Sequence, residues 1–182
     1  WNMTENYDTF EMSKFLIDEL AEAEKAGQQA WIITHIPWSD FDTLPIQGEV
    51  YRQIVTRFHE TITGIFHGHT HQDEFNVLYT DNEVKVENAI GHTLTCPSVT
   101  PFTNVNPGWR YYEVDSNSME IMNSYTFYNQ LNTTLANNGE EPAWELEYSA
   151  REAFDPTGEW PEDAPLNSTF WASAVEVIRN NE

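Results

Sequence analysis

The first third of the chain alternates between apolar patterns of two periods, which predicts a helix, a strand, a second helix and a second strand. The first helix is expected to end at Gly27, a residue typical of helix ends, and Asp8 and Glu11 have the spacing of a capping box at its start. Its apolar face is formed, at helical spacing, by Met12, Phe15, Leu16 and Leu20.

The nearly continuous apolar run 30–34 predicts a short buried strand, and Ile65 and Phe66 begin another. Between them, apolar residues at helical spacing predict a helix before Gly64: Val50, Tyr51, Ile54, Val55, Phe58 and Ile62. Strand, helix and strand at this spacing form a parallel βαβ unit. Each strand is followed by a histidine loop, 34–37 (THIP) and 67–71 (HGHTH), at the carboxyl end where open α/β sheets bind ligands.

Beyond His71 the pattern becomes that of short strands and then of helices. The predicted strands are 75–79, 84–86, 109–114 and 119–128, with turns at 80–83 and 115–118. Residues 96–108 contain three prolines and predict a long loop. From about Asn132 the pattern predicts helices, one over 144–154 and, after an acidic linker at 155–165, one over 170–178 with Ser168 or Thr169 as its cap.

Composition narrows the class of protein. The 182 residues suit one compact domain, or one domain with a small appendage, and 40% hydrophobic residues indicate a globular chain. No run of about 18 apolar residues is present, so we predict no membrane span. Thirty acidic and eight basic residues give a net charge of −22, which argues against nucleic acid or an anionic membrane surface as a tight partner. The same charge favours an acidic working environment.

Three Asn-x-Ser/Thr sequons, at Asn2, Asn132 and Asn167, indicate a glycoprotein that is secreted or lysosomal/vacuolar. Cys96 is the single cysteine, so no internal disulfide forms, and its neighbours predict a buried structural thiol. Because the sequence begins at Trp1 with no signal peptide before it, we interpret it as a processed chain or a piece of a longer one.

Four of the six histidines lie in the two loops that follow the predicted strands. Imidazole is the commonest protein metal ligand, so His35, His69 and His71 are the candidate metal ligands. His67 joins them if 67–71 stays extended, but it is a neighbour of the metal or a structural residue if the chain turns at Gly68.

The remaining polar residues near these loops have two interpretations. Asp73 and Glu74 either orient a ligating imidazole through its second nitrogen or are exposed loop carboxylates. We interpret His59 and His92 as surface or hydrogen-bonded residues.

The histidine loops and several later segments resemble the carboxyl-terminal half of the calcineurin-like metallophosphoesterases, and within them the acid sphingomyelinase-like branch with its fungal members. The resemblance covers nearly the whole chain. Its segments are 16–20 (LIDEL), 35–37 (HIP), 68–75 (GHTHQDEF), 106–112 (NPGWRYY) and 148–152 (YSARE).

The resemblance implies an α/β fold, in which 1–131 form the carboxyl-terminal half of a metallophosphoesterase β-sandwich flanked by helices and 132–182 form a small helical C-terminal subdomain. It implies a hydrolase of lipid metabolism with two zinc ions, His35 and His69 binding one and His71 the other. The implied substrate is a phosphodiester lipid such as sphingomyelin, which is cleaved to ceramide and phosphocholine. Two zinc ions would clamp the phosphate and hold the attacking hydroxide.

The sequence also departs from the family pattern. The family uses an upstream Asp-x-His, an Asp that bridges the metals and an Asn-His pair with the general acid, and neither motif occurs here. Because adjacent dications without a bridging carboxylate repel strongly, we expect the chain alone to hold at most one zinc ion weakly and to need a missing amino-terminal half as its partner. No catalytic residue is assigned. Thr34 stands where Gly is usual, and His67 where an aromatic residue is usual.

The loop aromatics form either a choline- or lipid-facing wall, with peripheral membrane contact, or part of the core; they are Trp38, Phe102, Trp109, Tyr111 and Tyr112. Phe170 and Trp171 are expected to pack rather than to enter a membrane. Two other hypotheses stay open. One is a non-catalytic module derived from a phosphoesterase that binds lipid, glycan or protein, and the other is an unrelated histidine-rich fold with one structural metal.

Overall fold

A computed structural model describes residues 8, 10–80, 83–102, 104–137, 141–155 and 157–180 and folds them into a mixed α/β structure. The helices are α1 (Met12–Ala26), α2 (Pro45–Arg57), α3 (Leu131–Ala136), α4 (Ala150–Phe154) and α5 (Ser168–Asn180), with a short 3-10 helix η1 (Val86–Asn88). The strands are β1 (Ala30–Ile33), β2 (Ile62–His67), β3 (Glu74–Tyr79), β4 (Ala89–Thr95), β5 (Gly108–Val114), β6 (Ile121–Tyr128) and β7 (Glu145–Ser149).

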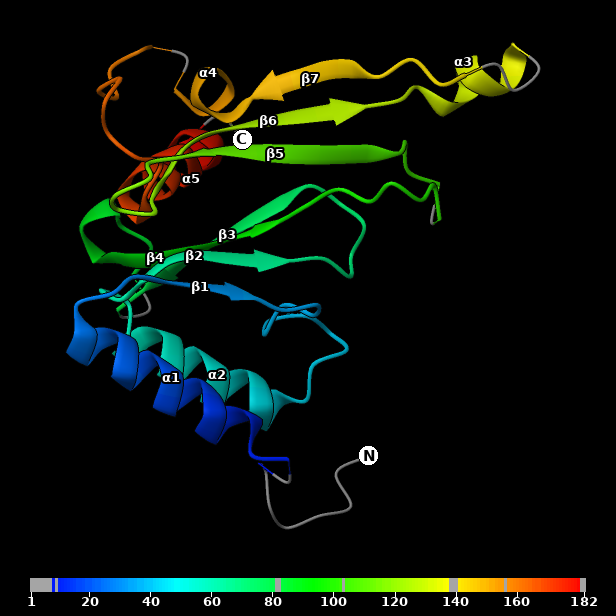
Figure 1. Ribbon diagram of the computed structural model, residues 1–182. Coiled ribbons are helices and arrows are strands. Elements are labelled where there is room, and N and C mark those ends of the chain that lie inside the picture. The colour runs from blue at the N-terminus through cyan, green and yellow to red at the C-terminus, as the bar shows by residue number, and fades with distance from the viewer. Residues whose placement is uncertain are drawn as a thin grey trace.

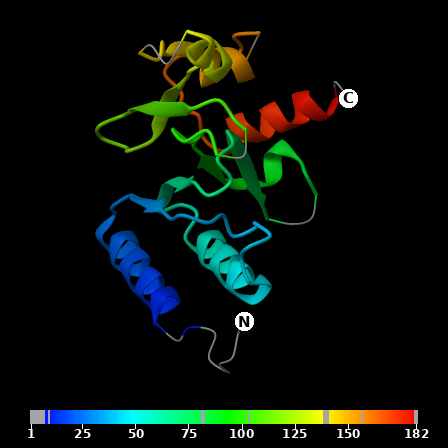
Figure 2. The same ribbon diagram turned by 90° about the vertical axis from the view of Figure 1, so that its right-hand side faces the viewer.

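The strands form two sheets. The first has the order β1-β2-β4-β3, in which β1, β2 and β4 are parallel and β3 is antiparallel to β4. The second is an antiparallel sheet of order β5-β6-β7. Helices α1 and α2 lie side by side against one side of the first sheet, and the second sheet lies on the other side (Figures 1 and 2). This arrangement confirms the predicted fold class and fits part of a metallophosphoesterase-like α/β domain.

Two apolar cores hold the layers together. The core between α1, α2 and the first sheet contains Leu20, Ile32, Ile54, Val55, Phe58, Ile65 and Leu78. The core between the sheets and α5 contains Leu94, Ile121, Ala150, Leu166, Phe170 and Trp171. Phe170 and Trp171 are buried, which confirms that they pack inside the protein. This second core contains residues from both 1–131 and 132–182, the two parts expected to form separate units. The two parts therefore share one apolar core.

The first helix begins differently from the predicted capping box. The Asp8 carboxylate accepts the backbone N–H groups of Ser13 and Lys14, each at 2.9 Å. Glu11 occupies the cap position with φ 55° and makes no capping hydrogen bond through its side chain. The helix ends at Gly27 as predicted, where φ is 65°. Within the described residues, only Leu20 of this helix is buried.

Three predictions of local structure are wrong, and one strand was not predicted. The helix expected before Gly64 was predicted to include Phe58 and Ile62, but α2 ends at Arg57 and Ile62 begins β2. Residues 84–86 are not a strand and instead lead into η1. No strand was predicted over 89–95, where β4 lies between β2 and β3. The segment 144–154 is not one helix, because 145–149 form β7 and only 150–154 are helical. The large residues of β7 recur at every second position, Leu146 and Tyr148, and this period of two is the strand signal that the helical interpretation overlooked.

Candidate metal centre

The parallel pairing of β1 and β2 brings the two histidine loops together. His35 follows β1 by two residues and His69 follows β2 by two residues, so both lie beyond the carboxyl ends of adjacent strands. The Gly68 N–H donates to the His35 carbonyl oxygen at 3.0 Å, which ties the loops to each other. The predicted βαβ unit and the adjacency of its two loops are therefore confirmed.

The chain turns after β2, but the turn is not made by its glycine. His69 and His71 both have left-handed backbone conformations, with φ of 75° and 64°. Gly68 does not have a positive φ. A non-glycine residue in this region of φ/ψ space is uncommon and is often found at functional sites. The strain of the turn thus falls on the two residues that the sequence analysis assigned to metal binding.

His35 and His69 face each other across the loops. The Nε2 of His35 lies 3.3 Å from the Nδ1 of His69, and the rings meet edge to face at an interplanar angle of 83°. Two nitrogens bound to one tetrahedral zinc ion at about 2.0–2.1 Å lie about 3.3–3.4 Å apart. The separation of these two nitrogens therefore matches that of two ligands of one zinc ion. Because His35 and His69 lie in two different loops, a metal site formed by both depends on the pairing of β1 with β2.

His71 is oriented differently. Its Nδ1 lies 3.4 Å from the carbonyl oxygen of Phe102, and the two rings are 5.9 Å apart edge to face. Phe102 belongs to the predicted loop between β4 and β5. The assignment of His71 to a second zinc ion stays a prediction.

His67 is the last residue of β2 and is buried. Its Nδ1 is 2.8 Å from the Thr34 hydroxyl oxygen, and its ring lies edge to face with Trp38. Burial lowers the pKa of His67 to about 4. Thr34 and His67 were noted separately as departures from the family pattern, and the structure places them in contact with each other between the two loops.

The two carboxylates after the histidine loop lie apart from the imidazoles. Asp73 forms an ion pair with Arg110, and the Tyr148 hydroxyl donates to the same carboxylate. Arg110 also donates to Tyr148 Oη at 2.6 Å and to Thr126 Oγ1 at 2.8 Å. Burial lowers the pKa of Arg110, but Asp73, Tyr148 and Tyr112 together outweigh burial and raise the pKa. Glu74 accepts a hydrogen bond from the Thr70 hydroxyl at 3.3 Å. This polar cluster links β3 to the second sheet.

The aromatic candidates divide into inward and outward groups. Tyr112 packs edge to face on Phe66 between the sheets, and Trp38 packs on Tyr51. Trp109 and Tyr111, on alternate positions of β5, are partly exposed on the outer face and stack on Phe127 and Tyr125 of β6. Phe102 is largely exposed near His71.

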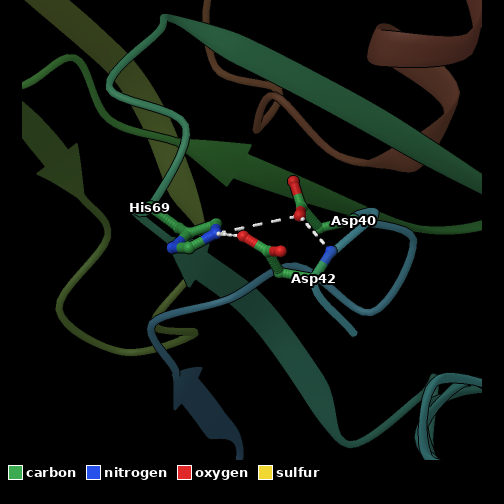
Figure 3. A group of neighbouring side chains, drawn as sticks. All are labelled: Asp40, Asp42 and His69. Carbon is green, nitrogen blue, oxygen red and sulfur yellow. Dashed lines mark hydrogen bonds and ion pairs between the residues drawn. The ribbon is translucent and has the colours of Figure 1, made fainter. Parts of the chain in front are cut away.

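Two residues near the imidazoles were missed by the sequence analysis. Asp40 and Asp42 lie in the loop after Pro37 and face the Nε2 side of His69 (Figure 3). His35 faces the Nδ1 side of the same ring. The Nε2 of His69 is 2.9 Å from Asp42 Oδ2 and 3.8 Å from Asp40 Oδ1. The available signal was the Asp-x-Asp spacing in the segment that directly follows the first histidine loop.

The other residues singled out in the sequence have simpler surroundings. The Nδ1 of His59 lies 3.0 Å from the Thr56 carbonyl oxygen, and His92 is buried beside Trp171. Cys96 is half-buried, and burial raises the pKa of its thiol. Of the sequons, Asn2 lies outside the described residues. Asn132 is exposed on α3, whereas Asn167 is half-buried and caps α5 by accepting the N–H groups of Thr169 and Phe170.

Comparison with known proteins identifies the class of protein to which the chain is similar. No family model matches the chain. It is 34% identical over 155 residues to sphingomyelin phosphodiesterase B of Dictyostelium discoideum, an alignment of 81% of this chain and 24% of that protein. It is 37% identical over 140 residues to sphingomyelin phosphodiesterase 1 of Caenorhabditis elegans (76% of this chain, 24% of that protein). Acid sphingomyelinase-like phosphodiesterase 3b of Homo sapiens is 31% identical over 163 residues (81% and 34%).

These similarities place the chain among the homologues of the metallophosphoesterases of the acid sphingomyelinase-like branch, which confirms the resemblance drawn from the histidine loops. The chain spans about a quarter to a third of the length of these curated relatives, 24–34%. Within the described residues, no helix is both long and apolar enough to cross a membrane.

Proposed function

We propose that this chain supplies part of a zinc-dependent phosphodiesterase site that hydrolyses sphingomyelin-type lipids to ceramide and phosphocholine. The observation that carries the proposal is the 3.3 Å separation of His35 Nε2 and His69 Nδ1, which suits one zinc ion. Zinc in such a site polarises the phosphate and provides a hydroxide nucleophile. The names of the relatives support the choice of substrate.

The residues of this chain have distinct roles in the proposal. His35 and His69 hold one zinc ion from adjacent loops, and His71 reaches a second ion from the other side of the turn. The remaining ligands, including a carboxylate that bridges the ions, come from a segment that corresponds to the amino-terminal part of the relatives. The absence of Asp-x-His and Asn-His from this sequence supports that division.

An exposed apolar surface supports the need for such a partner segment. Along α1 and the loop before it, Phe10, Met12 and Phe15 are 86%, 73% and 64% exposed. Ile33 of the edge strand β1 is 77% exposed. Exposed large apolar side chains gathered on one helix are typical of an interface. These exposed apolar side chains support an interface with the rest of a catalytic domain.

The proposal is tested in two stages. Calorimetric titration of the 182-residue chain with zinc should give one bound ion, which His35→Ala and His69→Ala abolish and the control His59→Ala retains. The chain is then combined with the amino-terminal part of one of the relatives, and hydrolysis of a chromogenic phosphodiester and of sphingomyelin is measured. Loss of hydrolysis in His69→Ala and His71→Ala is expected. Full hydrolysis in either variant contradicts the proposal.

A further inference from the structure

The two ring nitrogens of His69 face different partners. Its Nδ1 faces His35 Nε2 at 3.3 Å, and its Nε2 faces Asp42 Oδ2 at 2.9 Å. Asp42 reaches this position because its own N–H donates to Asp40 Oδ1 at 2.8 Å, which closes a tight turn in the loop (Figure 3). Asp40 Oδ1 is farther from His69 Nε2, at 3.8 Å.

The contact with Asp42 decides which nitrogen of His69 carries the proton. A carboxylate only accepts hydrogen bonds, so His69 must donate through Nε2–H. A neutral imidazole has one N–H, and Nδ1 then presents its lone pair toward His35. Ligating histidines in metalloproteins commonly donate their second N–H to a carboxylate, which fixes the tautomer and the orientation of the ring.

We propose that Asp42 is a positioning residue that holds His69 in the Nε2–H tautomer and directs its Nδ1 toward the metal position shared with His35. This inference rests on the proposed function. Asp40 has a different part, because its carboxylate oxygen holds the backbone of the turn. An asparagine at position 40 preserves that hydrogen bond while removing one negative charge, so Asp40→Asn is the matched control for charge.

The first experiment measures the tautomer without any metal. Nitrogen-15 chemical shifts of the His69 ring are recorded in the metal-free chain at about pH 8, above the ordinary imidazole pKa of about 6.5. The native chain and Asp40→Asn should show the Nε2–H tautomer, and Asp42→Ala should lose this preference. An Nδ1–H tautomer in the native chain, or an unchanged tautomer in Asp42→Ala, overturns the inference.

The second experiment measures zinc affinity by competition with a chromophoric chelator. Asp42→Ala should weaken zinc binding by about 10- to 100-fold, the range seen when an outer carboxylate partner is removed. Asp40→Asn should leave the affinity within about twofold. If both carboxylates instead bind the ion through the Nε2 side of His69, Asp40→Asn weakens binding as much as Asp42→Ala while His35→Ala does not, and the inference is wrong.

The two experiments separate failure of this inference from failure of the proposed function. Equal zinc binding by the native chain, His35→Ala and His69→Ala contradicts the proposed metal site. The tautomer of His69 still decides the role of Asp42 in that case, because it is read in the metal-free chain. If Asp42→Ala keeps both the native tautomer of His69 and the normal zinc affinity, the inference about Asp42 is wrong and the proposed metal site is unaffected.

Discussion

The segment 68–75 contains two kinds of polar site within a few residues of each other. Its first half, with His69 and His71, lies on a left-handed turn with partly exposed rings. Its second half begins with Asp73, whose carboxylate meets the almost fully buried guanidinium of Arg110, 3% exposed, and the hydroxyl of Tyr148. The imidazoles of His69 and His71 are accessible to a ligand. The Asp73 carboxylate instead forms its contacts with Arg110 and Tyr148 of the second sheet, so it joins the two sheets.

The largest effect is expected where the buried half is broken. Arg110→Met removes the only cationic partner that the described contacts give Asp73. The partly buried carboxylate then keeps the Tyr148 hydroxyl as a donor but has no cation to balance its charge. Removal of one member of a buried ion pair typically costs about 3–5 kcal/mol. Urea unfolding should show a loss toward the lower end of that range, because the Asp73 side chain is 26% exposed.

The matched double variant Arg110→Met with Asp73→Leu should recover part of that loss, since it removes both charges together. His69→Ala, in the other half of the segment, should change the free energy of unfolding by less than about 0.5 kcal/mol. A similar loss in His69→Ala and Arg110→Met would remove the distinction between the halves.

A second prediction contrasts a buried histidine with a half-buried one. Burial lowers the pKa of His92 to about 4, and its Nε2 has no hydrogen-bond partner among the described residues. The unfolded chain takes up a proton near pH 6.5, but the folded chain takes it up only near pH 4. The stability that comes from burying the neutral imidazole of His92 is therefore fully present above about pH 6.5, and it is lost progressively as the pH falls toward 4.

Chemical unfolding at a series of pH values checks this sign. His92→Phe keeps a ring beside Trp171 and should flatten the fall in stability across that interval, whereas His59→Gln, at a half-buried helix end, should leave the fall unchanged. An unaltered pH dependence in His92→Phe would show that other groups cause the fall. The prediction also bears on the acidic environment favoured by the composition, because the fold would lose stability there.

The smallest effect concerns the strain of the turn that carries His69 and His71. At His71 φ is 64°, a conformation that costs alanine about 1–2 kcal/mol but glycine little. His71→Gly should therefore be more stable than His71→Ala by about 1 kcal/mol in urea unfolding. At the neighbouring Gln72, which has no positive φ, the order should reverse, with alanine the more stable by a few tenths of a kcal/mol. The same order at both positions would show that His71 is unstrained.

The sequence was sufficient for the features that depend on local periodicity. The two helices, the strands beside them and the closeness of the two histidine loops follow from apolar spacing and the rule for parallel βαβ units. The border between the second helix and its strand was predicted too late, because Ile62 continues the helical spacing but begins β2. The central strand β4 was missed because it carries His92, Thr93 and Thr95, polar residues that the neighbouring layers bury. Burial of that kind is decided by distant residues and leaves no local pattern.

The candidate site shows the same limit. His35 and His69 were identified from their residue types and their positions after two strands. Asp42 was not, because its role depends on how the loop after Pro37 turns back toward His69. Thr34 and His67 were noted one at a time, 33 residues apart in sequence, and only the pairing of β1 with β2 makes them neighbours.

The position of β1 at the edge of its sheet links stability to mass action. The strand pairs with β2 on one side, and Ile33 is 77% exposed. Edge strands present backbone donors and acceptors that another strand can pair with. Any segment that pairs there binds the folded chain and not the unfolded one, so the midpoint of unfolding rises with the concentration of that segment. If such a segment pairs with β1, the melting temperature of this chain depends on the concentration of that segment.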